Sequence, residues 1–349
     1  MERKKKPDLV ILICTALLFL IGILTVSSTS FVLNYVSKIS FDKKHIMLSV
    51  LSILIIALLI AVDVRKFFSK GYLIIFYIFS IVLLIGLFSQ PAINNTHRFY
   101  KFPGFLFQPS EFVKILLVII AALILAEKKY PKSLLSLGKV LLPPIILILL
   151  QTDLGMSVLI IFVICIMLFY KGIPREHFLI VLGLSVLIMF LSILKEPYQM
   201  KRVKDFLEGE SEHQIAAKVA LGGGGFFGKG LGKSHQKFFY LSMPHTDFAF
   251  SILGEEMGFF GSFVVLCLYG IIFFRGMLLS TQMEGDFYKL LVFGLTVMFT
   301  LNSLIHISVN AGILPAKGIT LPLISYGGSS MLSNSLLLGI ILSISMRKP

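Results

Sequence analysis

Long uninterrupted apolar runs recur along the whole chain, and they restrict its possible folds more than any other feature. A transmembrane helix needs about 20 consecutive, mostly apolar residues, whereas the helices and strands of soluble proteins mix apolar with polar positions. Ten runs of this kind occur, at roughly 9–26, 46–62, 72–88, 113–126, 140–150, 156–169, 178–194, 248–274, 290–309 and 331–346. The sequence therefore predicts an all-α integral membrane protein with about ten transmembrane helices.

The composition agrees with a membrane protein. Of the 349 residues, 56% are hydrophobic and 14% are charged, whereas soluble domains carry roughly 25% charged residues. The three cysteines, Cys14, Cys165 and Cys267, stand singly inside apolar runs, without the spacing of a disulfide framework or a zinc site. An ordinary soluble protein is excluded, and residues 1–349 are expected to form a single polytopic membrane domain.

The distribution of positive charge indicates a topology. With the N-terminus in the cytoplasm, the cytoplasmic segments hold more than half of the 32 Lys and Arg residues, as the positive-inside rule requires. We therefore expect both termini in the cytoplasm. The first run follows a basic flank, but nine more runs come after it, so it is expected to be a span and not a cleaved signal. The net charge of +14 thus reflects membrane topology, and no nucleic-acid partner is expected.

One long outer loop, about 195–244 between the seventh and eighth runs, contains the glycine-rich stretch ALGGGGFFGKGLGKS. The stretch partly matches nucleotide-binding motifs, but Gly230 stands where a phosphate-binding loop needs Ser or Thr for the metal. The composition instead predicts a flexible basic segment that attracts phosphate, with a plain glycine hinge as the alternative. The lysines concerned are Lys218, Lys229, Lys233 and Lys237.

Ionisable residues inside apolar runs are costly, and they mark candidate functional sites. Glu111 and Lys114 are three residues apart in QPSEFVK, so they can pair on one helix face. A local ion pair that eases membrane insertion and a role in a polar cavity are both open. Asp153 in QTDLG falls at a tight turn, where it either caps the next helix or faces a site.

The most informative stretch is PHTDFAFSILGEEMGFFGS, in which Asp247 stands at the outer end of an apolar helix. Small residues at 251, 254, 258 and 261 fall on the same helix face. Such a stripe allows close helix packing, but it does not explain the carboxylate. Glu255 and Glu256 project away from this face, so neither is expected to share a site with Asp247.

The segment NAGILPAKGITLPLISYGGSS contains too many prolines and glycines for a regular helix. Irregular backbone at membrane depth is tolerated where it lines a cavity. Its polar residues are therefore candidate lining groups, with a surface turn as the alternative: Lys317, Tyr326, Ser329 and Ser330.

Five motifs, in this order, resemble the SEDS family (shape, elongation, division and sporulation), whose members FtsW and RodA are membrane peptidoglycan glycosyltransferases. The motifs extend over nearly the whole chain, and the last one is worded more like FtsW than RodA. They are QPSE at 108–111, QTDLG at 151–155, GKGLGKSHQKFFYL with PHTDF at 228–248, LGEEMGFFG at 253–261 and LPLISYGGSS at 321–330.

The resemblance implies polymerisation of lipid II, an undecaprenyl-diphosphate disaccharide-peptide, at the outer face of the bacterial cytoplasmic membrane during division or elongation. Asp247 is then the catalytic base that takes the proton of the attacking hydroxyl. A divalent cation such as Mg²⁺ is a further expectation, and a class B penicillin-binding protein is the expected partner. The implied substrate-binding residues are Arg98, Glu111, Lys114, Asp153, Arg202, Lys233, His245 and Ser329.

The chain departs from the family pattern at Phe99, where relatives usually carry tryptophan. The aromatic bulk is kept but the indole donor is lost. A flippase or transporter of lipid-linked precursors is the main alternative, since it also needs a polar intramembrane cavity. Most of the polar residues cluster on the outer side, however, whereas a transporter also needs access from the cytoplasm. A scaffold protein explains the apolar runs but not the buried charges.

Overall fold

The computed structural model describes residues 6–37, 41–92, 96–102, 105–127, 129–130, 132–195, 197–209, 211–238, 241 and 243–346. Within these residues, each predicted apolar run coincides with one long helix. By length and composition, seven helices of the described chain are suited to crossing a membrane. An all-α membrane protein is confirmed, and the count of ten spans stays a prediction. The long helices are α1 Leu9–Ser37, α2 Phe41–Ala61, α3 Lys70–Gly86, α4 Ser110–Glu127, α5 Lys132–Leu150, α6 Leu154–Tyr170, α7 Arg175–Lys195, α10 Ala249–Thr281, α11 Asp286–Asn310 and α12 Gly328–Ser345.

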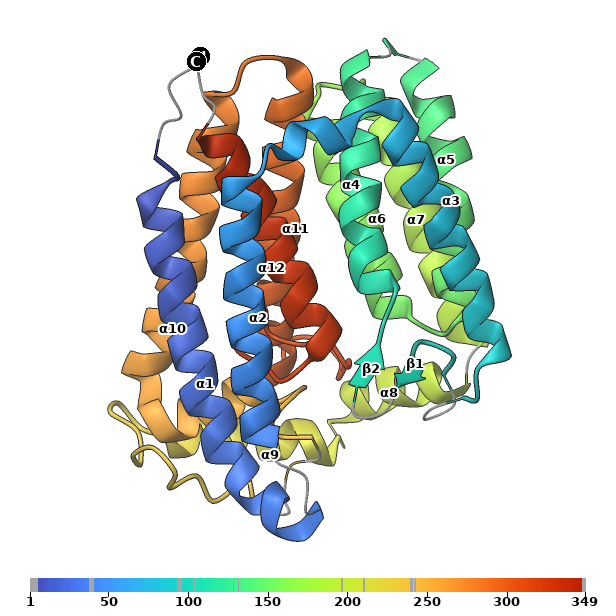
Figure 1. Ribbon diagram of the computed structural model, residues 1–349. Coiled ribbons are helices and arrows are strands. Elements are labelled where there is room, and N and C mark those ends of the chain that lie inside the picture. Colours follow the sequence, from blue (N-terminus) through green and yellow to red (C-terminus); the bar gives the residue numbers. More distant parts are fainter. Residues whose placement is uncertain are drawn as a thin grey trace.

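The long helices lie side by side in one bundle (Figure 1). α11 and α12 form its centre, because 78% and 83% of the residues in their most apolar stretches are buried, against 22% for α3. A 3₁₀ turn, η1 (Val64–Phe68), lies at one end of the bundle, and the other short elements gather at the opposite end. These are η2 (Leu87–Ser89), the antiparallel pair β1 (Tyr100–Phe102) and β2 (Phe105–Phe107), α8 (Pro197–Glu208) and α9 (Glu212–Gly223).

Polar contacts join the start of the first helix to the end of the last helix and to α10. The backbone N–H of Asp8, just before α1, donates to Oγ of Ser345 at the end of α12, at 3.2 Å. The Asp8 carboxylate also pairs with Arg275 of α10 at 2.8 Å. The first and last long helices therefore start and finish at the same end of the bundle, as an even number of crossings requires. Residues 1–5 and 347–349, which include part of the predicted cytoplasmic charge, lie outside the described residues.

Within the described residues, the connection between α7 and α10 contains two helices and a network of contacts, where the sequence predicted a flexible segment. It contains α8 and α9, and Gln214 of α9 donates to the carbonyl of Val309 at the end of α11 at 3.3 Å and to that of Leu314 just beyond it at 2.6 Å. Ala217 of α9 is fully buried in a small apolar cluster with Phe248 and Ile252. The sequence signal for flexibility was glycine content, which here serves close packing.

The link between α11 and α12 is irregular, as the prolines and glycines predict. Its backbone lies in the protein interior, where Leu321, Leu323 and Ile324 are almost fully buried. Tyr269 of α10 donates to the carbonyl of Pro322 at 2.6 Å, which satisfies one of the carbonyls that no helix can pair.

Candidate active site

A cavity of about 820 Å³ opens at the end of the bundle that carries the short elements. One part of its wall is polar and cationic, with Arg98, Arg202 and Lys317. The other part is apolar and comes from α6 and α11, with Phe162 and Ile305 among its residues. The cavity therefore suits a ligand with an anionic group joined to an apolar chain.

The three cations reach the cavity from three separate connections. Arg98 comes from the segment before β1, and its guanidinium lies 3.6 Å from the Asp153 carboxylate and 5.9 Å from the centre of the Phe99 ring. A phenyl ring supplies this cation–π contact as an indole ring does, so the contact needs no tryptophan. Arg202 of α8 donates to the carbonyl of Ala316 at 3.2 Å. Burial lowers the pKa of Lys317, and the nearby Asp153 carboxylate opposes that shift.

Asp153 serves both functions that the sequence left open. Its Oδ1 accepts from the Met156 N–H at 3.3 Å, which caps α6. Its Oδ2 accepts from the side-chain amide of Gln108 at 2.9 Å, and its carboxylate lines the cavity beside Arg98. The motifs QPSE and QTDLG therefore meet at this carboxylate.

The backbone around Asp247 is fixed by three hydrogen bonds to successive carbonyls. The carbonyl of His245 accepts from the Tyr326 N–H at 2.8 Å, and the carbonyl of Thr246 accepts from Ser325 Oγ at 2.7 Å. The carbonyl of Asp247 itself accepts from the side chain of Asn310 at 2.9 Å. The turn PHTDF is thus docked onto the motif LISYGG and onto the end of α11.

The Asp247 carboxylate faces the cavity wall at Gly318, where a Cβ would lie 3.4 Å from its Oδ2. Gly318 lines the cavity, whereas Asp247 itself does not, so its carboxylate adjoins the cavity lining at Gly318. Burial raises the pKa of Asp247 to about 6, although the charges of Arg202 and Arg98 and a hydrogen bond with the Thr246 side chain act in the opposite direction. A carboxylate with a pKa near neutrality is suited to general-base catalysis.

Glu111 and Lys114 pair at 2.6 Å, but neither of them lines the cavity. Both are buried, and Ser333 of α12 donates to the same Glu111 oxygen at 2.9 Å. Ser329 of α12 contacts the segment just before α4, because its Oγ accepts from the Gln108 N–H at 2.8 Å. In this structure the three residues hold the start of α4 against α12, which agrees with the local ion pair that the sequence allowed.

Lys233 and His245 also lie outside the cavity lining. The Lys233 side chain is exposed on the segment before α10. The His245 ring packs against Phe41 and Tyr326, with ring centroids 4.9 and 5.6 Å away. Burial lowers the pKa of His245 to about 4, so the ring is neutral at physiological pH and does not offer a positive charge to a phosphate.

Three residues of this region were not predicted from the sequence. Thr152 and Gln199 line the cavity, and Asn310 holds the backbone of Asp247 while its Oδ1 accepts from Ser251 N–H and Oγ at 3.0 and 2.8 Å. An asparagine near the end of a long apolar run was the available signal for Asn310. Gln199 had none, because its position depends on how α8 folds back.

The side chains at the cavity do not form a ligand set for a divalent cation. Nowhere in the described ranges do three or more His, Cys, Asp or Glu side chains come together as a metal site needs. Asp153 already accepts from Gln108, and Arg98, Arg202 and Lys317 line the same cavity. A cation placed among three positive side chains is electrostatically disfavoured.

Fold and site together define a multi-pass helical membrane protein with a cationic cavity and one poised carboxylate. Residues 8–349 match the family model described as "Cell cycle protein", the FtsW/RodA/SpoVE family. The chain belongs to this family. It is 32% identical to stage V sporulation protein E of Bacillus subtilis, with 98% of each chain covered. It is 33% identical to a probable peptidoglycan glycosyltransferase FtsW of Trichlorobacter lovleyi, over 98% of this chain and 94% of the relative.

Solved structures of the family share the fold. A chain of a peptidoglycan synthase complex, described as coordinating polymerization and crosslinking, superposes with a TM-score of 0.80 at 25% identity, with 97% of each chain covered. The rod shape determining protein RodA of Thermus thermophilus superposes with a TM-score of 0.71 at 26% identity, over 98% of this chain and 97% of the other.

Proposed function

We propose that this protein is a peptidoglycan glycosyltransferase that polymerises lipid II into glycan strands. The observation that carries the proposal is a cavity with three cations and an apolar wall, whose lining at Gly318 adjoins the poised Asp247 carboxylate. Lipid II has the matching parts, namely a sugar hydroxyl to deprotonate, a diphosphate and a polyprenyl chain. Relatives covered over nearly their full length bear the name of this activity.

In the proposed reaction, the 4-hydroxyl of one disaccharide attacks the anomeric carbon of another. Asp247 takes the proton of the hydroxyl as the new glycosidic bond forms. The bond between the anomeric carbon and the diphosphate oxygen breaks, and undecaprenyl diphosphate leaves with the electron pair. Arg98, Arg202 and Lys317 stabilise the charge that develops on the diphosphate.

The proposed setting follows from the same chemistry. The protein forms a single domain in the bacterial cytoplasmic membrane, with both termini in the cytoplasm and the cavity at the outer face. A class B penicillin-binding protein is its partner, because a strand polymerase must hand its product to a transpeptidase. The similarity to a chain of a synthase complex that joins polymerization with crosslinking supports this partner.

The experiment that tests the activity is Asp247→Asn, which keeps the shape of the side chain and removes the base. General-base catalysis contributes about 10²- to 10⁴-fold, so strand synthesis from purified lipid II should fall by that factor. Lipid II binding should stay near the parent level. Polymerisation at the parent rate would refute the catalytic role of Asp247, and loss of lipid II translocation instead would favour a flippase.

The proposed orientation has its own test. Ser211, between α8 and α9, is partly exposed. Ser211→Cys in a Cys267→Ser background should react with a membrane-impermeant thiol reagent in intact cells, after the outer membrane, where present, has been made permeable. Protection that persists until the cytoplasmic membrane is broken would reverse the topology.

A further inference from the structure

The helix that follows Asp247 is broken one third of the way along. Within α10, Gly258 has φ of 70° and ψ of −167°, which is not helical. In an unbroken helix, the N–H groups of Phe259 and Phe260 would donate to the carbonyls of Glu255 and Glu256. The break leaves two donors and two acceptors inside the protein without helical partners, and such groups must be satisfied elsewhere.

A strap, which we define as residues 224–237, supplies all four missing partners. Its backbone accepts from the two free N–H groups and donates to the two free carbonyls, and each bond is 2.9 or 3.0 Å long. The bonds run from Phe259 N–H to Gly225, from Phe260 N–H to Phe226, from Lys229 N–H to Glu255 and from Gly230 N–H to Glu256.

The strap and the helix approach too closely for side chains at the crossing. A Cβ at Gly224 would clash with the carbonyl of Gly254, and a Cβ at Gly228 would clash with that of Glu256. Gly228 also has a φ of 82°. The glycine cluster is therefore neither a nucleotide loop nor a hinge, because its glycines are needed for backbone contact across the break.

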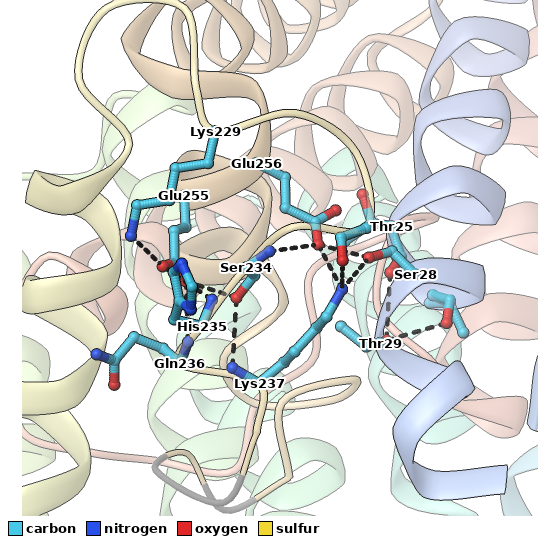
Figure 2. A network of polar contacts seen from close by, with 12 residues as sticks. Thr25, Ser28, Thr29, Lys229, Ser234, His235, Gln236, Lys237, Glu255 and Glu256 are labelled. Atoms are coloured by element: carbon cyan, nitrogen blue, oxygen red, sulfur yellow. Dashed lines mark hydrogen bonds and ion pairs between the residues drawn. The ribbon is translucent and has the colours of Figure 1, made fainter. Parts of the chain in front are cut away.

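Glu256 fixes one side of the short helical segment 249–257 (Figure 2). Its carboxylate accepts from Lys237 Nζ at 2.9 Å and from Ser28 Oγ of α1 at 2.5 Å. Lys237 also donates to Ser28 Oγ at 2.9 Å and to the carbonyl of Gly232 at 2.7 Å. The side chains of this ion pair are each 2% exposed, so segment 249–257, the strap and α1 are joined by a fully buried charge network.

Glu255 fixes the other side of the same segment. Its carboxylate pairs with Lys229 at 2.7 Å and accepts from Ser234 Oγ at 2.5 Å. It also accepts from the backbone N–H groups of His235 and Gln236 at 3.1 and 3.2 Å. As the helical periodicity predicts, neither glutamate joins the Asp247 site.

We propose that Glu255 and Glu256, through Lys229 and Lys237, are positioning residues for glycosyl transfer. They clamp the segment 249–257, which begins two residues after Asp247, and the other end of the turn is fixed by Asn310 and Ser325. The clamp holds the Asp247 carboxylate against Gly318 at the cavity wall. This inference deepens the proposed function, because it names residues that set the position of its base.

The first test measures position without measuring activity. A Cβ at Gly318 lies 3.9 Å from Cγ of Asp247, so Asp247→Cys with Gly318→Cys should form a disulfide under mild oxidation in a Cys267→Ser background. Adding Lys237→Met, which leaves Glu256 without its cation, should slow this cross-linking several-fold. Lys171→Met is the matched control, because it removes an ion pair, with Asp286, that lies away from the strap.

The second test separates positioning from folding. With the native Asp247, Lys237→Met and Glu255→Gln should lower kcat per folded molecule by about ten- to a hundredfold, the usual cost of a displaced catalytic group, while KM for lipid II changes little. Lys237→Arg, which keeps the charge, should restore part of kcat. If Lys237→Met does not fold, Ser28→Ala is the alternative, because it removes the contact with α1 and leaves the ion pair in place. This variant should also lower both the cross-linking rate and kcat.

The two tests distinguish a positioning role from a purely structural role. Unchanged cross-linking and unchanged kcat per folded molecule, with only the melting temperature lowered, would overturn the clamp and leave a purely structural ion pair. If Asp247→Asn polymerises lipid II normally, the proposed function fails, but the cross-linking rate still decides whether the clamp positions residue 247.

Discussion

Carboxylates in two regions of the molecule have opposite surroundings. At the strap, Glu255 accepts hydrogen bonds from four groups and Glu256 from three, including a lysine in each case. At the cavity, the Asp247 carboxylate faces the backbone of Gly318, and burial raises its pKa to about 6. A fully bonded acid holds structure together, whereas an acid with few donors stays reactive at a cost in stability.

Asp153 is intermediate between a carboxylate whose hydrogen bonds are all made within the protein and a carboxylate that has few donors. Its carboxylate accepts from Met156 N–H and from the Gln108 side chain, yet it also lines the cavity beside Arg98. Its bonds commit it to a fixed orientation, so it is suited to positioning Arg98 and not to accepting a proton.

The largest effect that the comparison predicts is at Glu111 and Lys114, which belong with the bonded acids. Removing one partner of a buried ion pair leaves an uncompensated charge and costs about 3 to 5 kcal/mol. Glu111→Gln and Lys114→Met should therefore each destabilise the protein strongly, and the double variant should destabilise it less than the sum of the two. Additive losses would show that the pair contributes no coupling.

Stability can be followed with a thiol-reactive dye, since the chain has no tryptophan. Cys14 and Cys165 are buried and become reactive on unfolding, while the exposed Cys267 is replaced by serine in all variants. Lys70→Met, which removes the exposed ion pair with Glu127 at the other end of α4, should leave the melting temperature within error of the parent.

A smaller effect on stability, and one of opposite sign, is expected when Asp247 is replaced. Its pKa is 3.8 when unperturbed and about 6 in the fold, so the folded state binds the proton more tightly. Stability therefore falls as the pH rises from about 4 to about 6, and the ionised carboxylate is a cost above that range. Asp247→Asn should stabilise the protein by about 1 to 2 kcal/mol at pH 7.5 and little at pH 4.5. If Asp247→Asn and the parent had equal melting temperatures at pH 7.5, the ionised Asp247 would carry no cost in stability and would resemble the hydrogen-bonded acids Glu255 and Glu256.

The sequence predicted the long helices well because each apolar run is a local signal with a known length. It also predicted that Glu255 and Glu256 lie apart from Asp247, although Asp247 belongs to the turn before α10 and the helical period therefore does not describe its position. The glycine cluster was misread as a flexible segment. Glycine signals either freedom or close approach, and the distinction depends on the break at Gly258, which lies about 30 residues further along the chain.

The composition of the cavity was only partly predictable. Arg98, Asp153 and Arg202 do line it, but they come from three connections whose meeting is a property of the whole bundle. Glu111, Lys114 and Ser329 were grouped with them because a buried charge or a nearby serine gives the same sequence signal in a cavity and in a helix contact. Only the packing of α4 against α12 shows that these residues form a helix contact and do not line the cavity.

The smallest predicted effect concerns the pH dependence of the reaction. Asp247 must be ionised to accept a proton, so kcat/KM should fall as the pH drops through about 6. Arg202 lowers the pKa of Asp247, and removing its charge should therefore move this acidic limb to higher pH by a fraction of a unit. Arg202→Gln also weakens diphosphate binding, so the test is the pH at which the acidic limb falls and not the maximum value of kcat/KM.

Lys204→Gln is the matched control, because it removes the same charge from α8 at an exposed residue paired with Glu208, and its limb should coincide with that of the parent. A limb that stays in place in Arg202→Gln would mean that Arg202 does not act on the base. A limb that moves equally in both variants would assign the effect to the overall charge of α8, and the contrast between the poised acid and the bonded acids would then no longer depend on the cations at the cavity.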